Sequence, residues 1–279
     1  MSDNWIVQNL ENALDFWNGK LREVFRLLTT SPDAFKDGKI WTVMTGIYGT
    51  LQAVGYALLV VFFVIGVVKV CGSFAEIKRP EAAGRLFIRF ILAKAAISYG
   101  MEVILMIVRV TQGIAGSILD TAGISRFRST LIPDEIIEAI ENVDGIFSNV
   151  GLWAVTLIGS LVVWVLAFVM ILSVYGRFFR IYLYTAIAPV PLATMAGEPT
   201  QHIARSFVKS FAGVCLEGAV IVLACTFYQI FVGTAPEVDL DASASTMVWT
   251  YLGEVIFNML ILVGTIKGSD RVVKEMMGI

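Results

Sequence analysis

Ionisable side chains interrupt several stretches of sequence that are otherwise apolar. The ones that stand out are Arg89, Lys94, Glu102, Glu217 and Glu254. A charged side chain inside a membrane costs roughly 3 kcal/mol or more, so such residues usually face the protein interior and pair with one another. The chemistry open to them is therefore ion pairing between helices, or the lining of a passage that holds water.

The depth of each charge along its helix indicates which of them can meet. At about 1.5 Å per residue, Lys94 lies about 12 Å from the inner end of its expected span and Glu217 lies about 10 Å from the same side. We therefore expect Lys94 to pair with Glu217, whereas Glu102 and Glu254 fall in the outer half. Two interpretations stay open. Either the charges tie helices together, or Lys94 and the three glutamates line a wet passage.

Motifs for catalysis and for metal binding are absent from the sequence. His202 is the only histidine, and neither a G-x-S-x-G nor a G-x-x-x-x-G-K-[ST] motif occurs. Cys71, Cys215 and Cys225 lie in or at the edge of apolar stretches, with no histidine at ligand spacing, so we interpret them as small buried residues. The sequence predicts no enzyme, no cofactor and no metal, and any ATP-driven step belongs to another protein.

A segment broken by prolines is among the elements that must position the charges. Residues 181–197 form an apolar stretch that contains Pro189 and Pro191. Each proline removes a backbone donor and pushes the residue before it out of helical geometry. Broken backbone at membrane depth is stable only when it is buried in protein or lines a wet cavity. We therefore expect a re-entrant or discontinuous element here, preceded by Arg177 and Arg180.

The composition of the chain is that of a membrane protein. Of its 279 residues, 57% are hydrophobic and 16% are charged, which nearly excludes a soluble core, and a net charge of -2 does not favour binding of nucleic acid. A helix needs about 20 apolar residues to cross a bilayer. The stretches that meet this requirement are residues 40–68, 86–108, 145–176, 210–232 and 247–266. We predict an all-α, polytopic transmembrane helix bundle of five spans plus the proline-broken re-entrant segment.

The basic residues of the loops predict an orientation. If residues 181–197 return to the side they left, eleven basic residues lie in the inner loops and three in the outer loops. A competing topology has six full spans with both ends inside. It places eight basic residues in the inner loops and six in the outer loops when the N-terminal tail is left out. The five basic residues of the N-terminal tail fit the competing topology better. We predict five spans in the cell membrane, with the N-terminus outside and the C-terminus in the cytoplasm.

Residues 1–39 form an amphipathic segment ahead of the transmembrane domain, residues 40–279. Its apolar residues recur at intervals of three and four, which predicts a helix with one apolar face. They are Ile6, Leu10, Leu14, Trp17, Leu21, Val24 and Leu28. We expect this helix to lie on the membrane surface, and a role as a docking helix for a partner protein is a compatible alternative.

The stretch from Arg177 to His202, RFFRIYLYTAIAPVPLATMAGEPTQH, resembles the central signature of the TrbL-like family. That family comprises polytopic inner-membrane subunits of type IV secretion and conjugation systems. The signature combines a basic residue, an apolar half-helix and Ala-Pro-x-Pro-Leu. The order of spans and residues 211–218 are similar to the short versions carried by conjugative elements of Gram-positive bacteria. The resemblance covers nearly the whole chain, although many relatives carry a long hydrophilic C-terminal extension.

The resemblance implies a channel or scaffold subunit of a conjugative type IV secretion system that contributes to transfer of DNA or protein. The partners that it implies are further copies of the chain in a homo-oligomer, other membrane subunits of the system, a secretion ATPase and membrane lipid. Transient contact with the transferred DNA or protein is also implied. A secondary transporter is the alternative, because broken helices and charges near the midplane also occur in transporters. The substrate, the number of subunits and the composition of any pore stay open.

Overall fold

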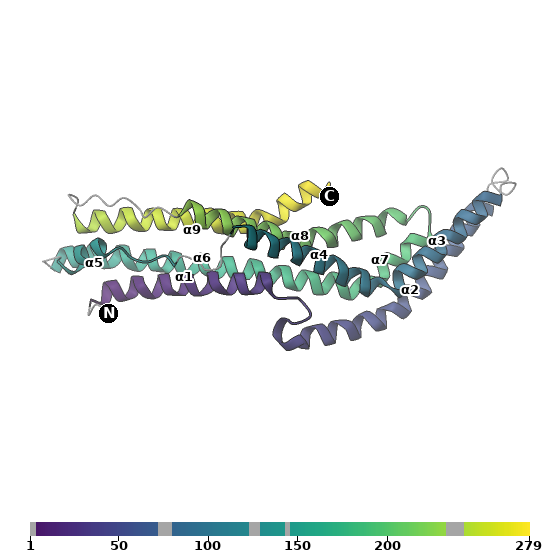
Figure 1. The fold of residues 1–279 in the computed structure, drawn as a ribbon, viewed down its shortest axis with the longest axis horizontal. Helices are drawn as coiled ribbons and strands as arrows, with labels where there is room; N and C mark the ends of the chain where they lie inside the picture. The colour runs from purple at the N-terminus through teal and green to yellow at the C-terminus, as the bar shows by residue number, and fades with distance from the viewer. Residues whose placement is uncertain (1–3, 72–79, 123–128, 143–145, 233–242) are drawn as a thin grey trace. The chain divides into compact units, whose positions relative to one another are not determined.

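The computed structural model describes residues 4–71, 80–122, 129–142, 146–232 and 243–279, and nearly all of these are helical (Figure 1). The elements are α1 (Trp5–Thr29), η1 (Phe35–Gly38), α2 (Lys39–Cys71), α3 (Pro80–Ser98), α4 (Gly100–Ala122), α5 (Asp134–Glu141), α6 (Ile146–Ile187), α7 (Pro189–Ala193), η2 (Thr194–Ala196), α8 (Gln201–Phe231) and α9 (Ala244–Met277). This architecture confirms the predicted all-α class.

Five helical stretches are long and apolar enough to cross a membrane. They are Phe35–Val68, Gly100–Ala122, Val150–Ile187, Gln201–Phe231 and Ala244–Met277. Two of them contain the predicted spans 40–68 and 247–266, and two others overlap most of the predicted spans 145–176 and 210–232. Gly145, where one of these predicted spans begins, lies outside the described residues. The chain is therefore a multi-pass membrane protein by the length and composition of its helices.

The predicted span over residues 86–108 is wrong in its bounds. α3 ends at Ser98, the chain bends at Tyr99, and α4 begins at Gly100. The expected span therefore joins the end of one helix to the beginning of the next. It was mistaken for a single helix because apolar residues continue through the bend without a proline or a polar loop.

Polar side chains of α2 contact the backbone at this bend. The hydroxyl of Tyr48 donates to the Ile97 carbonyl at 3.2 Å, and the side-chain amide of Gln52 donates to the same carbonyl at 3.0 Å. The hydroxyl of Tyr56 lies 2.9 Å from that of Ser98. Because the three α2 residues are four positions apart, they lie on one face of that helix. These side chains provide hydrogen-bond partners for polar groups at the bend, which lipid could not provide.

The chain divides into two compact units, and the first consists of Met1–Thr29, Ala115–Tyr175 and Val220–Ser269. In this unit α1 lies along the first half of α6 (Figure 1). The pairs in contact are Trp5 with Trp153, Asn9 with Ser160, Phe16 with Trp164, and Glu23 with Tyr175. Residue numbers rise together along both helices, so α1 and α6 run parallel and in the same direction.

The apolar face of α1 is buried in protein. Leu10, Trp17 and Val24 are all fully buried, as are most of the other apolar residues on that face. The helix is amphipathic, as predicted. The prediction that it rests on the membrane surface is wrong, because its apolar face packs against α6 and other parts of the first unit instead of facing lipid.

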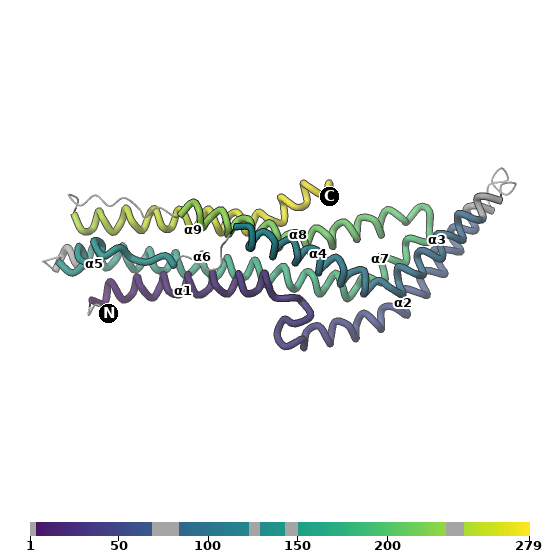
Figure 2. The backbone as a smooth tube through the Cα atoms, viewed as in Figure 1, coloured from purple at the N-terminus to yellow at the C-terminus, as the bar shows by residue number. Residues whose placement is uncertain are grey.

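The second unit consists of Thr30–Ile114, Gly176–Ala219 and Asp270–Ile279. Here α2, α3, α7 and η2 pack around a common hydrophobic core. Figure 2 follows the chain through the end of α6 and the short α7 into α8. A Cβ at Gly55 of α2 would lie 2.9 Å from the carbonyl oxygen of Pro189, so the backbones of α2 and α7 are in close contact. Glycine allows this approach because it has no side chain.

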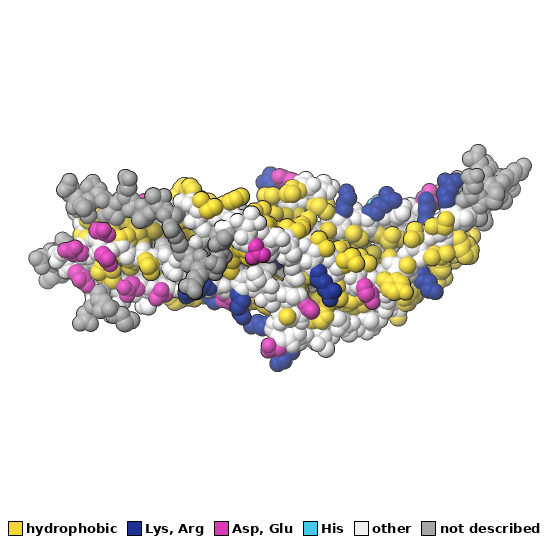
Figure 3. Space-filling model, viewed as in Figure 1, with side chains coloured by type: hydrophobic (Ala, Val, Ile, Leu, Met, Phe, Trp, Pro, Cys, Tyr) yellow, Lys and Arg dark blue, Asp and Glu magenta, His cyan; other side chains and the backbone are white. Residues whose placement is uncertain are grey.

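Large hydrophobic side chains remain exposed on the outside of the helices. On α2 they include Val60, Val61 and Val64, and on α3 they include Phe87 and Ile91. In Figure 3 hydrophobic side chains gather over these two helices. A soluble protein seldom exposes apolar patches this extensive, whereas a membrane protein presents them to lipid.

Candidate functional site

The proline-containing segment is a tight connection between two long helices. α6 ends at Ile187, the five-residue α7 begins at Pro189, and the 3₁₀ turn η2 follows. The hydroxyl of Thr200 closes the connection by donating to the Thr194 carbonyl at 2.9 Å. The predicted break is thus confirmed at Pro189, while Pro191 lies inside α7. That the segment re-enters the membrane stays a prediction.

Arg177, on α6, is buried against the backbone of α8. Its guanidinium donates from Nε to the Val214 carbonyl at 3.3 Å and from Nη2 to the Cys215 carbonyl at 3.2 Å. A Cβ at Gly218 would clash with the guanidinium carbon and with both terminal nitrogens. The glycine therefore makes the recess in which the buried cation lies, and the helix carbonyls provide its hydrogen-bond acceptors.

Arg180 lies one turn further along α6 and binds two carboxylates. Its Nη2 is 2.7 Å from both oxygens of Glu217 on α8, and its Nη1 is 2.8 Å from Oδ1 of Asp270 on α9. Lys274 then binds the other oxygen of Asp270 at 2.8 Å. We call Arg177, Arg180, Glu217, Asp270 and Lys274 the arginine cluster. It joins α6, α8 and α9 through charged groups.

The arginine cluster is arranged as a structural tie. The Glu217 side chain is only 4% exposed, and that of Arg180 is 33% exposed. A buried carboxylate is tolerated when a cation satisfies its oxygens with good geometry, and the bidentate contact provides this. A small pocket of about 80 Å³ lies beside Arg180. The geometry favours the interpretation in which charges hold helices together.

The pair predicted between Lys94 and Glu217 is not formed. Glu217 binds Arg180 instead, and Lys94 is exposed on α3 without an ion-pair partner in the part of the chain that the structure describes. The sequence places Arg180 after the end of the expected span 145–176, so it was not predicted as a partner for Glu217. Arg180 in fact continues the helix of its span.

The other predicted intramembrane charges are not members of the arginine cluster. Arg89 approaches Glu198 at 3.5 Å, a weak contact between partly exposed side chains. Glu102 is exposed on α4 in the second unit, and Glu254 is exposed on α9 in the first unit. A role for these residues in a wet passage stays a prediction.

Sequence reasoning missed Asp270 and Lys274, because they were counted as part of a charged cytoplasmic tail. A signal was present: Asp270 and Lys274 are four residues apart, the spacing of a helical ion pair, and α9 continues through them. The cysteine prediction is confirmed for Cys215 and Cys225, which are buried. The side chain of Cys71 lies outside the described residues.

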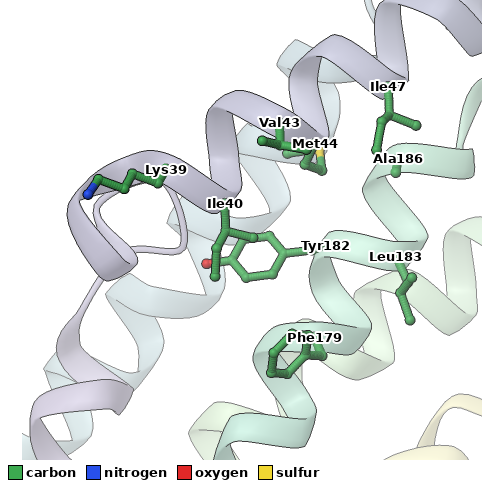
Figure 4. Close-up of a pocket in the computed structure, with 9 residues that line it drawn as sticks. All are labelled: Lys39, Ile40, Val43, Met44, Ile47, Phe179, Tyr182, Leu183 and Ala186. Carbon is green, nitrogen blue, oxygen red and sulfur yellow. The ribbon is translucent and has the colours of Figure 1, made fainter.

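An apolar pocket of about 440 Å³ lies between the start of α2 and the end of α6 (Figure 4). Ile40 and Val43 line it from α2, and Phe179 and Leu183 line it from α6. Lys39 stands at one end, where Figure 4 shows its side chain pointing away from the apolar residues. Such a lining offers contacts for hydrocarbon.

The sequence model of one protein family matches residues 17–189, which is more than half of the chain. Its description reads TrbL/VirB6 plasmid conjugal transfer like protein. The match includes Arg177, Arg180 and Pro189 of the resemblance described above and stops before Pro191. No curated protein and no solved structure matches the chain.

Proposed function

Because the chain belongs to the TrbL/VirB6 plasmid conjugal transfer-like family, we propose that it forms the membrane part of the transfer channel in a conjugative type IV secretion system. Several copies assemble into a homo-oligomer beside other membrane subunits of the system. A secretion ATPase supplies the energy. The transferred DNA or protein makes only transient contact with the chain. The N-terminus lies outside the cell and the C-terminus in the cytoplasm.

The arginine cluster is the observation that carries the proposal beyond family membership. It ties together three candidate spans, α6, α8 and α9, through ion pairs in which the Glu217 carboxylate is only 4% exposed. A channel subunit must keep its helices in a fixed arrangement while a large substrate passes. Charge pairs inside a membrane provide such fixation, because separating them would leave charges in lipid.

The size of the pocket beside Arg180 argues against a transporter site at the arginine cluster. Ligand pockets generally measure about 300–1,000 Å³, whereas this one measures about 80 Å³. It has room for water but not for most solutes. We therefore favour an assembly component of a translocation machine over a secondary transporter.

Complementation of a donor strain tests the proposal. A donor that lacks the gene is supplied with the wild-type protein, with Arg180→Gln or with the control Arg271→Gln. The control removes an exposed ion pair to Glu275 on α9. We expect the deletion to abolish conjugative transfer, Arg180→Gln to lower it strongly and the control to restore it. Wild-type transfer frequency in the deletion strain would refute the proposal.

A further inference from the structure

The pocket between the start of α2 and the end of α6 lies wholly within the second unit. Its floor consists of Met44, Tyr182 and Ala186, which are all buried. The hydroxyl of Tyr182 donates to the Pro32 carbonyl at 2.8 Å, so its polar group already has a partner. Apart from Lys39 and this hydroxyl, every side chain that lines the pocket is hydrocarbon or thioether. The interior therefore suits an apolar ligand.

Exposed apolar side chains form the rim of the pocket. Val43 is 65% exposed and Ile47 is 47% exposed on α2, and Phe179 and Leu183 are exposed on α6 (Figure 4). All four residues belong to helices that are long and apolar enough to cross a membrane. The pocket therefore opens toward the lipid around these helices and not toward the interior of the protein.

α2 and the end of α6 run in the same direction beside the pocket. The ring of Trp41 lies 6.5 Å from that of Tyr182, and further along both helices the backbone at Gly55 lies against Pro189. The two helices belong to the first and third candidate spans. In a topology of five spans these two spans cross the membrane in the same direction, so the pocket is compatible with the proposed orientation.

The dimensions of the pocket fit one hydrocarbon chain. Its lining on α2 extends from Lys39 to Ile47, a rise of about 12 Å. Half of the hydrocarbon core of a bilayer is about 15 Å thick, so the pocket is nearly as long as one leaflet is deep. Over this length, a volume of about 440 Å³ corresponds to a groove about 7 Å across, narrower than a helix with its side chains, about 10–12 Å.

Lys39 gives the pocket a charged end. It is exposed, and it precedes Val43 by four residues and Ile47 by eight, so it stands above them on one face of α2. Figure 4 shows its side chain pointing away from the apolar lining. A lysine placed in this way reaches the headgroup region of a membrane, where its ammonium group can bind phosphate. The pocket thus combines an apolar groove with a cation at one end.

We propose that the pocket binds one acyl chain of a phospholipid whose phosphate pairs with Lys39. The inference goes beyond the proposed channel function and does not depend on it. Asp33, Lys36 and Asp37 are also exposed in the connection before α2, so both signs of charge are present there. We therefore expect recognition of the phosphate and not selection for lipids with a net negative charge.

Native mass spectrometry of the purified chain tests the inference. The chain is extracted in detergent, washed free of loosely held lipid and incubated with phosphatidylglycerol, and the wild type should retain one lipid per chain. Val43→Trp should lower this retention at least about tenfold, because the indole takes the space of the acyl chain. Val61→Trp is the matched control, since position 61 is 51% exposed on α2 and does not line the pocket.

The phosphate contact is tested with a second lipid. Lys39→Gln should lower retention of phosphatidylglycerol about fivefold, the effect of one lysine at a membrane surface. Lys94→Gln, which removes an exposed lysine on α3, should have no effect. Diacylglycerol with the same acyl chains lacks the phosphate, so Lys39→Gln should not change its retention. An equal loss for both lipids would refute the pairing of Lys39 with phosphate.

A phospholipid with a photoreactive diazirine in its acyl chain provides a measurement that does not depend on the folding of a variant. In the wild-type chain, crosslinks should concentrate on Val43, Ile47 and Leu183 and not on Val61 and Val64, which are also exposed. Even labelling along α2 would overturn the inference, because it would show only the lipid that surrounds any span. Undiminished retention by Val43→Trp would also overturn it.

A photoreactive amino acid at position 43 distinguishes lipid from a protein neighbour in donor cells. We expect crosslinks to lipid, which leave the mobility of the chain on a gel nearly unchanged. If the main product joins the chain to a second copy or to another membrane subunit, the pocket is a protein interface and the inference is wrong. Loss of conjugation is not a readout here, so a chain that retains lipid without supporting transfer would refute only the proposed function.

Discussion

Gly218 of α8 lies directly against the guanidinium group of Arg177, so that no side chain can be added at position 218 without displacing a buried cation. The contact explains why an arginine is stable in the middle of a helix bundle. The carbonyls of Val214 and Cys215 accept its hydrogen bonds, and the missing side chain leaves room for the planar group.

Gly218→Ala should therefore lower the free energy of unfolding in detergent by about 1–3 kcal/mol, the usual cost of overpacking a buried site. Gly264→Ala, on α9, is the control because a Cβ there meets no atom within 4 Å. The control should be neutral or more stable by up to about 1 kcal/mol, since alanine favours helix. Equal unfolding curves for both variants would argue against the recess at Gly218.

Removing Arg180 should cost more than removing the carboxylate of Glu217. Arg180→Gln takes the bidentate cation from a buried carboxylate, and breaking such a pair costs about 3 kcal/mol or more. After Glu217→Gln, Arg180 keeps its contact with Asp270 at 2.8 Å, so the loss should be smaller. Thermal unfolding of the two variants in detergent checks the order. A larger loss of stability in Glu217→Gln than in Arg180→Gln would mean that the contact of Arg180 with Asp270 contributes little to stability.

A methyl group at position 100 should disturb the bend between α3 and α4. A Cβ at Gly100 would lie 2.6 Å from the hydroxyl oxygen of Tyr48. Gly100→Ala should therefore destabilise the protein by about 1–3 kcal/mol, and Tyr48→Phe in the same chain should recover part of the loss. Additive effects in this double-mutant cycle would show that the hydroxyl is not the obstacle.

Side chains after the proline break should be reachable only from the cytoplasm. Glu198 and His202 are exposed in the structure, so a cysteine at either position is open to a reagent that reaches that side. We expect an impermeant maleimide to label His202→Cys in inside-out vesicles and not in intact cells. Labelling from outside intact cells would favour six full spans.

The long apolar helices and the break at Pro189 could be predicted from the sequence, because span length and proline chemistry act locally. The bend at Tyr99 could not, since no proline or polar loop marks it. The position of α1 could not either, because a helix with one apolar face fits a membrane surface and a protein groove equally well. The contact of Arg180 with Asp270 joins residues 90 positions apart. Such a pair depends on how α6, α8 and α9 pack together, which the local sequence does not show.

Recovery of DNA during its transfer tests whether the chain is part of the transfer channel. Donor cells are treated with formaldehyde during conjugation, the tagged chain is isolated under denaturing conditions, and the plasmid strand bound to it is quantified. We expect enrichment of the transferred strand over chromosomal DNA with the wild-type chain and with Arg271→Gln, and loss of that enrichment with Arg180→Gln. Enrichment no greater than that of an unrelated multi-pass membrane protein, in cells that transfer DNA normally, would contradict the channel role.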